Sequence, residues 1–339
     1  MVIQGKLYEG ADLADRQERV RRTNDMSTSK TVLFYRDFQV FSGGHLKVWD
    51  YYQHLVLSGV FRPKIFFSEQ TAWTPDNPWF GLSGETEEFW IPEQADILFL
   101  AGLDWLMIER RALPSSTPII NLIQGVCHAD PNDRRYQFLS QRAIRICVSE
   151  QVAMCLRATK RVNGPIYTIP NGLDLGRMPL ARPHPQRDIS VLIAGLKNRP
   201  LAEYLAVSLA QRGIRAELLL GAMPREAFLD RLSRANIVVL LPHEQEGFFL
   251  PALEAMALEA LVVCPDCVGN RSFCLNGVNS FRPCYDPERI LHATLRAAEL
   301  SDREADDYRR AGLQTAAEHD LMRERGMFLE IMENVEQIW

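Results

Sequence analysis

The sequence lacks the long apolar segments of a membrane-spanning protein. Its apolar runs fall far below the roughly 20 consecutive residues needed to cross a bilayer. The first 30 residues carry scattered charges and no apolar stretch of the kind found in a secretory signal. An excess of positive charge is also absent, because 38 Lys and Arg stand against 43 Asp and Glu, a net charge of −5. We therefore expect no nucleic-acid partner and at most peripheral membrane association.

Cysteine is scarce as well. The chain has seven, an odd number, which favours reduced thiols in the cytoplasm, or at the inner face of the membrane, over a disulfide framework. Repeats with a period of roughly 20 to 50 residues and low-complexity tracts are missing, which excludes solenoids and disordered chains. With 339 residues, 47% of them hydrophobic, the chain is long enough for two globular domains.

Short β-branched and aromatic blocks recur in the first half of the chain. Most are apolar without alternation, which is typical of strands covered on both faces. Segments with helical spacing lie between them, for example at 46–58 and 150–161. The pattern predicts a parallel α/β sheet with strands at 31–35, 64–67, 95–100, 119–123, 145–148 and 166–169.

The same pattern begins again after a proline-rich stretch at 179–185, which we interpret as a linker. A second set of strands is predicted at 189–194, 216–220, 237–241 and 261–264. Helices are predicted at 201–212, 225–235, 250–260, 287–300, 302–318 and 321–338. The predicted fold class is α/β, with two Rossmann-like, doubly wound parallel-sheet domains facing each other across a cleft. The predicted units are an extension (1–30), a first domain (31–178) and a second domain (186–319).

One segment, 242–257, joins a strand end, a glycine turn and a helix start. Pro251 suits the first turn of a helix, so the free N–H groups of Gly247 to Leu250 are expected to point at the cleft, where they can bind phosphate. Glu246 is expected at the mouth of this loop and Glu254 on the helix, so that one carboxylate contacts sugar hydroxyls and the other a ribose. On these residues alone, solvated acids near a helix start are the simpler interpretation.

Residues 246–257, EGFFLPALEAMA, resemble the signature E-G-F-G-L-P-x-x-E-A-M-A of glycosyltransferase family 4, with its two glutamates. Phe249 departs from it, because it stands where the family has glycine and narrows the room beside the phosphates. Further similarities to family motifs extend the resemblance from about residue 31 to 290. They lie at 41–49, 169–174, 261–271 and 276–281.

The resemblance implies the GT-B architecture and transfer of a sugar from a nucleotide diphosphate sugar with retention, with no cofactor and no bound metal. The acceptor is expected to be a glycan, a glycolipid or another lipid-linked or hydroxyl compound, as in polysaccharide biosynthesis. A C-terminal helix at 320–339 is expected to cross back and complete the first, acceptor-binding domain. Glu246 takes a catalytic role. The residues that the resemblance implies for donor binding are Gly247, Phe248, Phe249, Leu250 and Glu254.

Cations are expected where a departing diphosphate needs neutralising, at the end of the first strand of the second domain. Lys197 and Arg199 follow that strand and are our candidates for donor binding. The family places Arg at the position of Leu196, so the two cations stand at shifted positions.

Two loops of the first domain hold further candidates. Ser42, Gly43 and Gly44 precede a helix, and the glycines allow the backbone to approach a substrate closely. His128 follows the strand at 119–123, where family members carry a histidine near the transferred sugar. Gln124 aligns with that histidine equally well.

Other interpretations fit parts of the sequence. Cys264 and Cys267 have the spacing of zinc ligands but fall in a stretch that fits the family loop, so no metal is expected. The arginines and lysine within 134–161 fit a solvated helix face better than an acceptor surface. A glycoside hydrolase would need its carboxylates on opposite walls. A nucleotide-sugar epimerase and a non-catalytic nucleotide-sugar-binding protein both stay open, the second because of Leu196 and Phe249.

Overall fold

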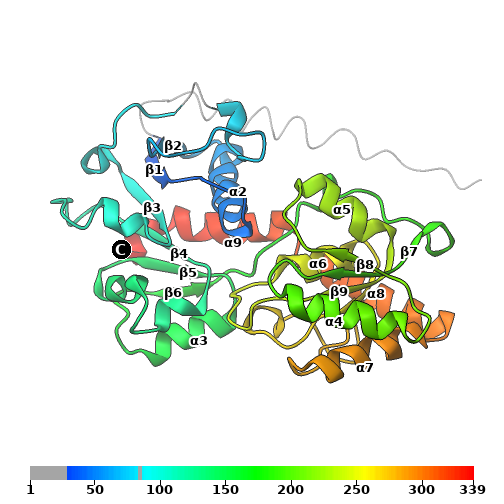
Figure 1. The fold of residues 1–339 in the computed structure, drawn as a ribbon. Helices are drawn as coiled ribbons and strands as arrows, with labels where there is room; N and C mark the ends of the chain where they lie inside the picture. The colour runs from blue at the N-terminus through cyan, green and yellow to red at the C-terminus, as the bar shows by residue number, and fades with distance from the viewer. Residues whose placement is uncertain (1–28, 83–85) are drawn as a thin grey trace, which may run out of the picture.

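The computed structural model describes residues 29–82 and 86–339, so nearly all of the predicted extension at 1–30 lies outside the described residues. Two parallel sheets, one of six strands and one of four, lie next to each other with the helices packed around them (Figure 1). The predicted fold class is therefore confirmed. The two sheets contain all ten predicted strands.

The first sheet has the order β2-β1-β3-β4-β5-β6, with all pairs parallel. Its strands are β1 (Thr31–Arg36), β2 (Arg62–Phe67), β3 (Ile97–Ala101), β4 (Ile119–Ile123), β5 (Ile144–Cys147) and β6 (Ile166–Thr168). Strands β1, β3, β4 and β5 are buried along their whole length, as their apolar sequences require. Helices α2 (Gly43–Ser58) and α3 (Glu150–Ala158) follow β1 and β5.

The second sheet has the order β10-β9-β7-β8, again all parallel. Its strands are β7 (Ile189–Ala194), β8 (Ala216–Leu219), β9 (Ala235–Leu240) and β10 (Leu261–Val263). Its helices are α4 (Arg199–Ala210), α5 (Arg225–Arg234), α6 (Leu250–Ala257) and α7 (Pro287–Ala298). Ala194 pairs with Leu240, so the loops that follow β7 and β9 open at the same edge of the sheet.

Helix ends differ from the sequence expectation where capping decides them. Helix α2 begins three residues earlier than predicted, because the Ser42 side chain accepts the His45 N–H at 3.3 Å. Helix α6 ends three residues earlier, because Glu259 adopts a left-handed conformation with φ +56°. The Ala260 N–H then bonds the Ala255 carbonyl and the Glu259 N–H bonds the Met256 carbonyl, the pattern of a Schellman motif.

The chain passes between the two halves twice, and the two passages lie against each other. The Leu173 N–H donates to the His319 carbonyl at 2.8 Å, and the Leu321 N–H donates to the Leu173 carbonyl at 2.9 Å. Gly172 fits only without a side chain, because a Cβ there would lie 2.7 Å from the Leu321 Cα. The last passage joins α8 (Asp302–Glu318) to α9 (Leu321–Glu333).

Helix α9 packs beside α2 against the first sheet (Figure 1). Phe328 on α9 meets Tyr51 of α2, with ring centroids 4.7 Å apart, and its ring is fully buried. The single C-terminal helix that the sequence pattern predicts is divided in two, because α9 ends at Glu333 and α10 (Val335–Ile338) follows.

Candidate functional site

The loops after β7 and β9 bring a lysine and a glutamate together. Lys197 follows β7 and Glu246 follows β9, and the Lys197 ammonium forms an ion pair with the Glu246 carboxylate. The Lys197 Nζ also lies over the Phe249 ring, 5.4 Å from its centroid. Both side chains stay partly exposed, 38% for Lys197 and 20% for Glu246. The pair therefore presents a cation and a carboxylate to solvent at the carboxyl edge of the sheet.

The first domain touches this loop directly. Gly125 and Glu246 form an isolated antiparallel bridge, and the Ser149 hydroxyl at the start of α3 donates to the Gly247 carbonyl at 2.8 Å. A Cβ on Gly247 would lie 2.2 Å from the Gln124 carbonyl oxygen, so only glycine allows this close approach. Gln124 and Ser149 are therefore site neighbours. Sequence reasoning mentioned Gln124 only as an alternative to His128 and missed Ser149.

The predicted glycine loop lies beside the same junction. The Gln124 side-chain amide donates to the Gly44 carbonyl at 3.2 Å, and a Cβ on Gly43 would lie 3.8 Å from the Leu250 Cδ1. Ser42 serves as the N-cap of α2. The structure thus places Gly43, Gly44, Glu246, Gly247 and Leu250 around one interdomain junction.

The amides before α6 are not all free. The Phe249 N–H donates to the Gly269 carbonyl at 3.0 Å, so the prediction of a free N–H at this position is wrong. Gly269 lies so close to the loop that a Cβ would come within 2.8 Å of the Phe248 nitrogen. Phe248, Phe249 and Leu250 are themselves buried, and Phe248 stacks on Phe273 at 5.0 Å. The side chains of this loop hold it in place.

Glu254 is in a different environment from Glu246. Its side chain is only 2% exposed and forms an ion pair with Arg225 at 2.5 Å. Contact between Glu254 and a ribose would therefore require the buried carboxylate to become accessible. Arg225 is the first residue of α5, and its position in the sequence gives no signal of this contact.

The structure does not bring Arg199 to the Lys197–Glu246 pair. Arg199 is the first residue of α4, and its Nε binds Glu203 one turn further along that helix at 2.7 Å. Its side chain is 66% exposed. Lys197 alone of the two predicted cations contacts Glu246.

Two histidines of the first domain are held neutral. His128 lies in the short helix η4 (Val126–Ala129) and is buried. Burial, reinforced by Arg135, lowers its pKa to about 3. Burial and then Arg36 lower the pKa of His45 to about 4. Sequence reasoning did not name His45, although its position directly after Gly43 and Gly44 could have indicated it.

The low pKa of His128 predicts acid sensitivity. Between its ordinary value near 6.5 and about 3, the unfolded chain takes up a proton that the folded chain does not, so stability falls as the pH falls through this range. When the pH falls from 7.5 to 5, the free energy of unfolding of His128→Asn is expected to decrease by about 1–2 kcal/mol less than that of the wild type. Urea denaturation at both pH values measures this difference. His292 is an exposed histidine, and an equally reduced loss of stability in the control variant His292→Asn would contradict this prediction.

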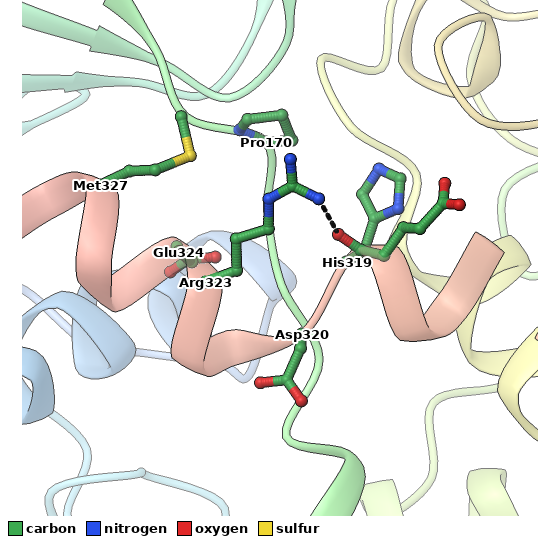
Figure 2. A pocket seen from close by; sticks show the side chains of 7 residues that line it. Pro170, His319, Asp320, Arg323, Glu324 and Met327 are labelled. Carbon is green, nitrogen blue, oxygen red and sulfur yellow. Dashed lines mark hydrogen bonds between the residues drawn. The ribbon is translucent and has the colours of Figure 1, made fainter. Parts of the chain in front are cut away.

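A cavity of about 220 Å³ lies away from this junction, between the end of α8 and the start of α9 (Figure 2). Pro170, His319 and Arg323 are among the residues that line it, and Arg323 donates to the Glu318 carbonyl. The His319 ring packs on Phe248 with centroids 5.8 Å apart, so the cavity lies behind the Phe248 loop. None of the predicted site residues lines it.

Residues 29–82 and 86–339 contain neither a metal-binding cluster nor a helix that could span a membrane. No group of three or more His, Cys, Asp and Glu side chains there is arranged to hold a metal ion. Cys264 and Cys267 are buried, and the Cys264 sulfur accepts a hydrogen bond from the Asn270 side-chain amide. In the same described part of the chain, no helix has the length and apolarity needed to cross a membrane.

Comparison with known proteins supports the fold. Solved structures similar to this chain include a glycosyltransferase from Rickettsia africae, at 13% identity and a TM-score of 0.67, covering 91% of this chain and 99% of that one. Sucrose-phosphate synthase from Thermosynechococcus elongatus gives 12% identity and a TM-score of 0.65, covering 90% and 99%. Anabaena HepE in complex with UDP and glucose gives 12% identity and a TM-score of 0.62, covering 90% and 100%.

Sequence comparison reaches only part of the chain. No curated protein sequence matches it. The family model described as "Glycosyl transferases group 1" matches residues 175–299, which contain Lys197, Glu246 and Glu254. The protein therefore has the GT-B fold. The match of residues 175–299 to the group 1 glycosyltransferases supports a glycosyltransferase.

Proposed function

We propose that the protein is a retaining glycosyltransferase that moves a sugar from a nucleotide diphosphate sugar to a hydroxyl of a glycan, a glycolipid or another acceptor. The observation that carries the proposal is the Lys197–Glu246 ion pair, which lies at the carboxyl edge of the second sheet and against the first domain. Ligands of open α/β sheets bind at this edge. The match of residues 175–299 to group 1 glycosyltransferases supports the same reaction class.

The chemistry needs opposite charges at this place. When the bond between sugar and diphosphate stretches, negative charge grows on the leaving diphosphate and positive charge on the sugar. Lys197 provides a cation for the first, and Glu246 a carboxylate for the second. We propose that the arriving diphosphate draws Lys197 away from Glu246, which frees the carboxylate to hold the sugar. No metal is required in this scheme, so transfer is expected to persist in a chelator.

The first test is nucleotide recognition. UDP, GDP, ADP and dTDP are compared by thermal shift, and one of them is expected to raise the melting temperature by several degrees because it binds only the folded state. UDP is the first candidate, since the similar Anabaena HepE has been solved with UDP and with UDP-glucose. Lys197→Met is expected to abolish the shift, whereas Arg199→Met, which changes an exposed cation paired with Glu203, is expected to retain it.

Product analysis then separates the remaining functions. The nucleotide sugar that binds is incubated with and without a panel of hydroxyl acceptors, and transfer with the anomeric configuration retained supports the proposal. Isomerised sugar in the absence of acceptor would instead identify an epimerase. A clear thermal shift without any turnover would identify a binding protein.

A further inference from the structure

A second cavity, of about 280 Å³, lies between the linker and the far side of the second domain. It is separate from the Lys197–Glu246 junction, because its walls come from the linker, from Arg187 just before β7, from Glu259 just after α6 and from helix α8. The side chains that line it are mostly charged. The titratable residues among them are Arg182, His184, Arg187, Glu259, Asp306 and Arg309, and Ala181 and Pro183 complete the lining.

Arg187 forms the fixed wall of this cavity. Its guanidinium donates to three backbone carbonyls, those of Arg182 at 2.8 Å, Ala235 at 2.6 Å and Leu258 at 2.8 Å. It neutralises no carboxylate through these bonds, so its positive charge is held by neutral partners in a buried place. Burial, followed by the nearby charge of Arg309, lowers its pKa to about 10. Its hydrogen bonds thus leave this charge uncompensated, and the nearby Glu259 carboxylate offsets part of it.

Arg309 faces the same cavity from α8 and is only 8% exposed. Its Nη1 binds Asp306 at 3.1 Å, but within the described residues its buried Nε has no hydrogen-bond partner. A buried N–H of a charged group that lacks an acceptor is costly, so such a group normally has a partner. The hydrogen bonds within the described residues therefore leave the Arg309 guanidinium only partly satisfied.

The charges on the wall favour an anion. Three guanidinium groups face two carboxylates, Glu259 and Asp306, and His184 adds a further positive charge when it is protonated. Asp306 is already engaged by Arg309, and Arg182 reaches Asp230 outside the cavity while its side chain remains 43% exposed. One arginine guanidinium can bind two oxygens of a phosphate through two parallel, charge-assisted hydrogen bonds.

We propose that this cavity binds a phosphate group, either as free inorganic phosphate or as part of a small phosphorylated molecule. A phosphomonoester carries about −1.5 to −2 charges at neutral pH and so offsets the excess of arginine. A cavity of about 280 Å³ holds this group with a small organic part, since one water in the liquid occupies roughly 30 Å³. The ligand joins the linker to α8 through the guanidinium groups of Arg182 and Arg309.

Equilibrium dialysis of the full chain with radiolabelled inorganic phosphate, at constant ionic strength, tests the proposal. Saturable binding is expected, and Arg309→Gln and Arg182→Gln are each expected to weaken it about tenfold, the loss of one charge-assisted bond. Glu259→Gln removes a carboxylate from the wall and is expected to tighten binding. The matched control is Arg310→Gln, because Arg310 is an exposed arginine next to Arg309 on α8.

Competition identifies the source of the phosphate group. Displacement of the label by glycerol 3-phosphate at lower concentration than by unlabelled phosphate indicates a phosphorylated molecule, and the reverse order indicates the free ion. Displacement by UDP at donor concentrations would place the label at the diphosphate site and overturn the proposal. It is overturned equally by an absence of saturable binding, or by an Arg310→Gln effect as large as that of Arg182→Gln. Because Arg182 lies on the exposed linker, its variant tests the site even if Arg309→Gln fails to fold.

Discussion

Glu324→Ala is expected to lower the free energy of unfolding by about 3–5 kcal/mol, the usual loss when one partner of a buried ion pair is removed. Glu324 lies on α9 and is fully buried. Its carboxylate accepts from the Lys47 ammonium at 2.7 Å and from the Gly172 N–H, and it lies 3.1 Å from the His54 Nε2. Three polar groups from two other segments therefore depend on one side chain.

The alanine variant leaves these groups without their acceptor in a buried place. Lys47 is only 1% exposed; burial alone favours its neutral form, but Asp50 and Glu324 hold its pKa above the ordinary value. Without Glu324 the ammonium keeps only Asp50 and the Gly172 carbonyl, at 2.7 and 3.3 Å. Unfolding in urea, followed by tryptophan fluorescence, measures the loss. Near-ultraviolet circular dichroism before denaturant is added checks that the variant starts folded.

Two further variants test whether the lost stability of Glu324→Ala comes from unpaired buried charge or from a general effect of changing helix α9. Lys47→Met combined with Glu324→Leu replaces the ion pair by apolar side chains and is expected to recover part of the lost stability, because no unpaired ammonium remains. The recovery is partial because the Gly172 N–H and His54 still lose their acceptor and Asp50 loses its cation. Glu330→Ala changes an exposed glutamate on the same helix and is expected to alter stability by less than about 0.5 kcal/mol. If Glu324→Ala behaves like Glu330→Ala, the cluster does not hold α9 in place.

The contact between α9 and α2 also shows where sequence reasoning ends. All ten strands were predictable, because apolar blocks such as Ile119–Ile123 require burial on both faces. Most helices were predictable from their spacing in the same way. Lys47 and Glu324 gave no signal, since they are 277 positions apart and each fits an exposed helix position when read alone. Local pattern determines the elements but does not show which polar side chains meet.

The candidate site divides along the same line. The motif at 246–257 was sufficient to single out Glu246, and the strand order of the second sheet brings Lys197 to it. The Phe249 amide was assigned wrongly, because its acceptor, the Gly269 carbonyl, comes from a loop twenty residues later in the chain. Spacing within one segment predicts which groups are near a helix start. It does not predict which of them another loop has already engaged.

Glu246→Gln is expected to reduce the rate of sugar transfer by about 10²–10³-fold, the loss typical of one group that stabilises developing charge. The amide keeps the size of the side chain and removes its charge, so the fold is expected to be unaffected. Binding of the nucleoside diphosphate is expected to be unchanged or tighter, because Lys197 no longer has the Glu246 carboxylate as a competing partner. The transfer rate and the thermal shift therefore move in different directions.

Steady-state transfer assays and the nucleotide thermal shift measure the two effects in the same preparations. Glu244→Gln is the matched control, because Glu244 is an exposed glutamate two residues earlier in the same loop, and it is expected to leave both readouts near the wild type. Lys197→Met is expected to lower both readouts together, since its cation is needed for the diphosphate in the bound and the reacting state. A wild-type transfer rate in Glu246→Gln would remove this carboxylate from the reaction, while a lost thermal shift would show that it holds the loop rather than the sugar.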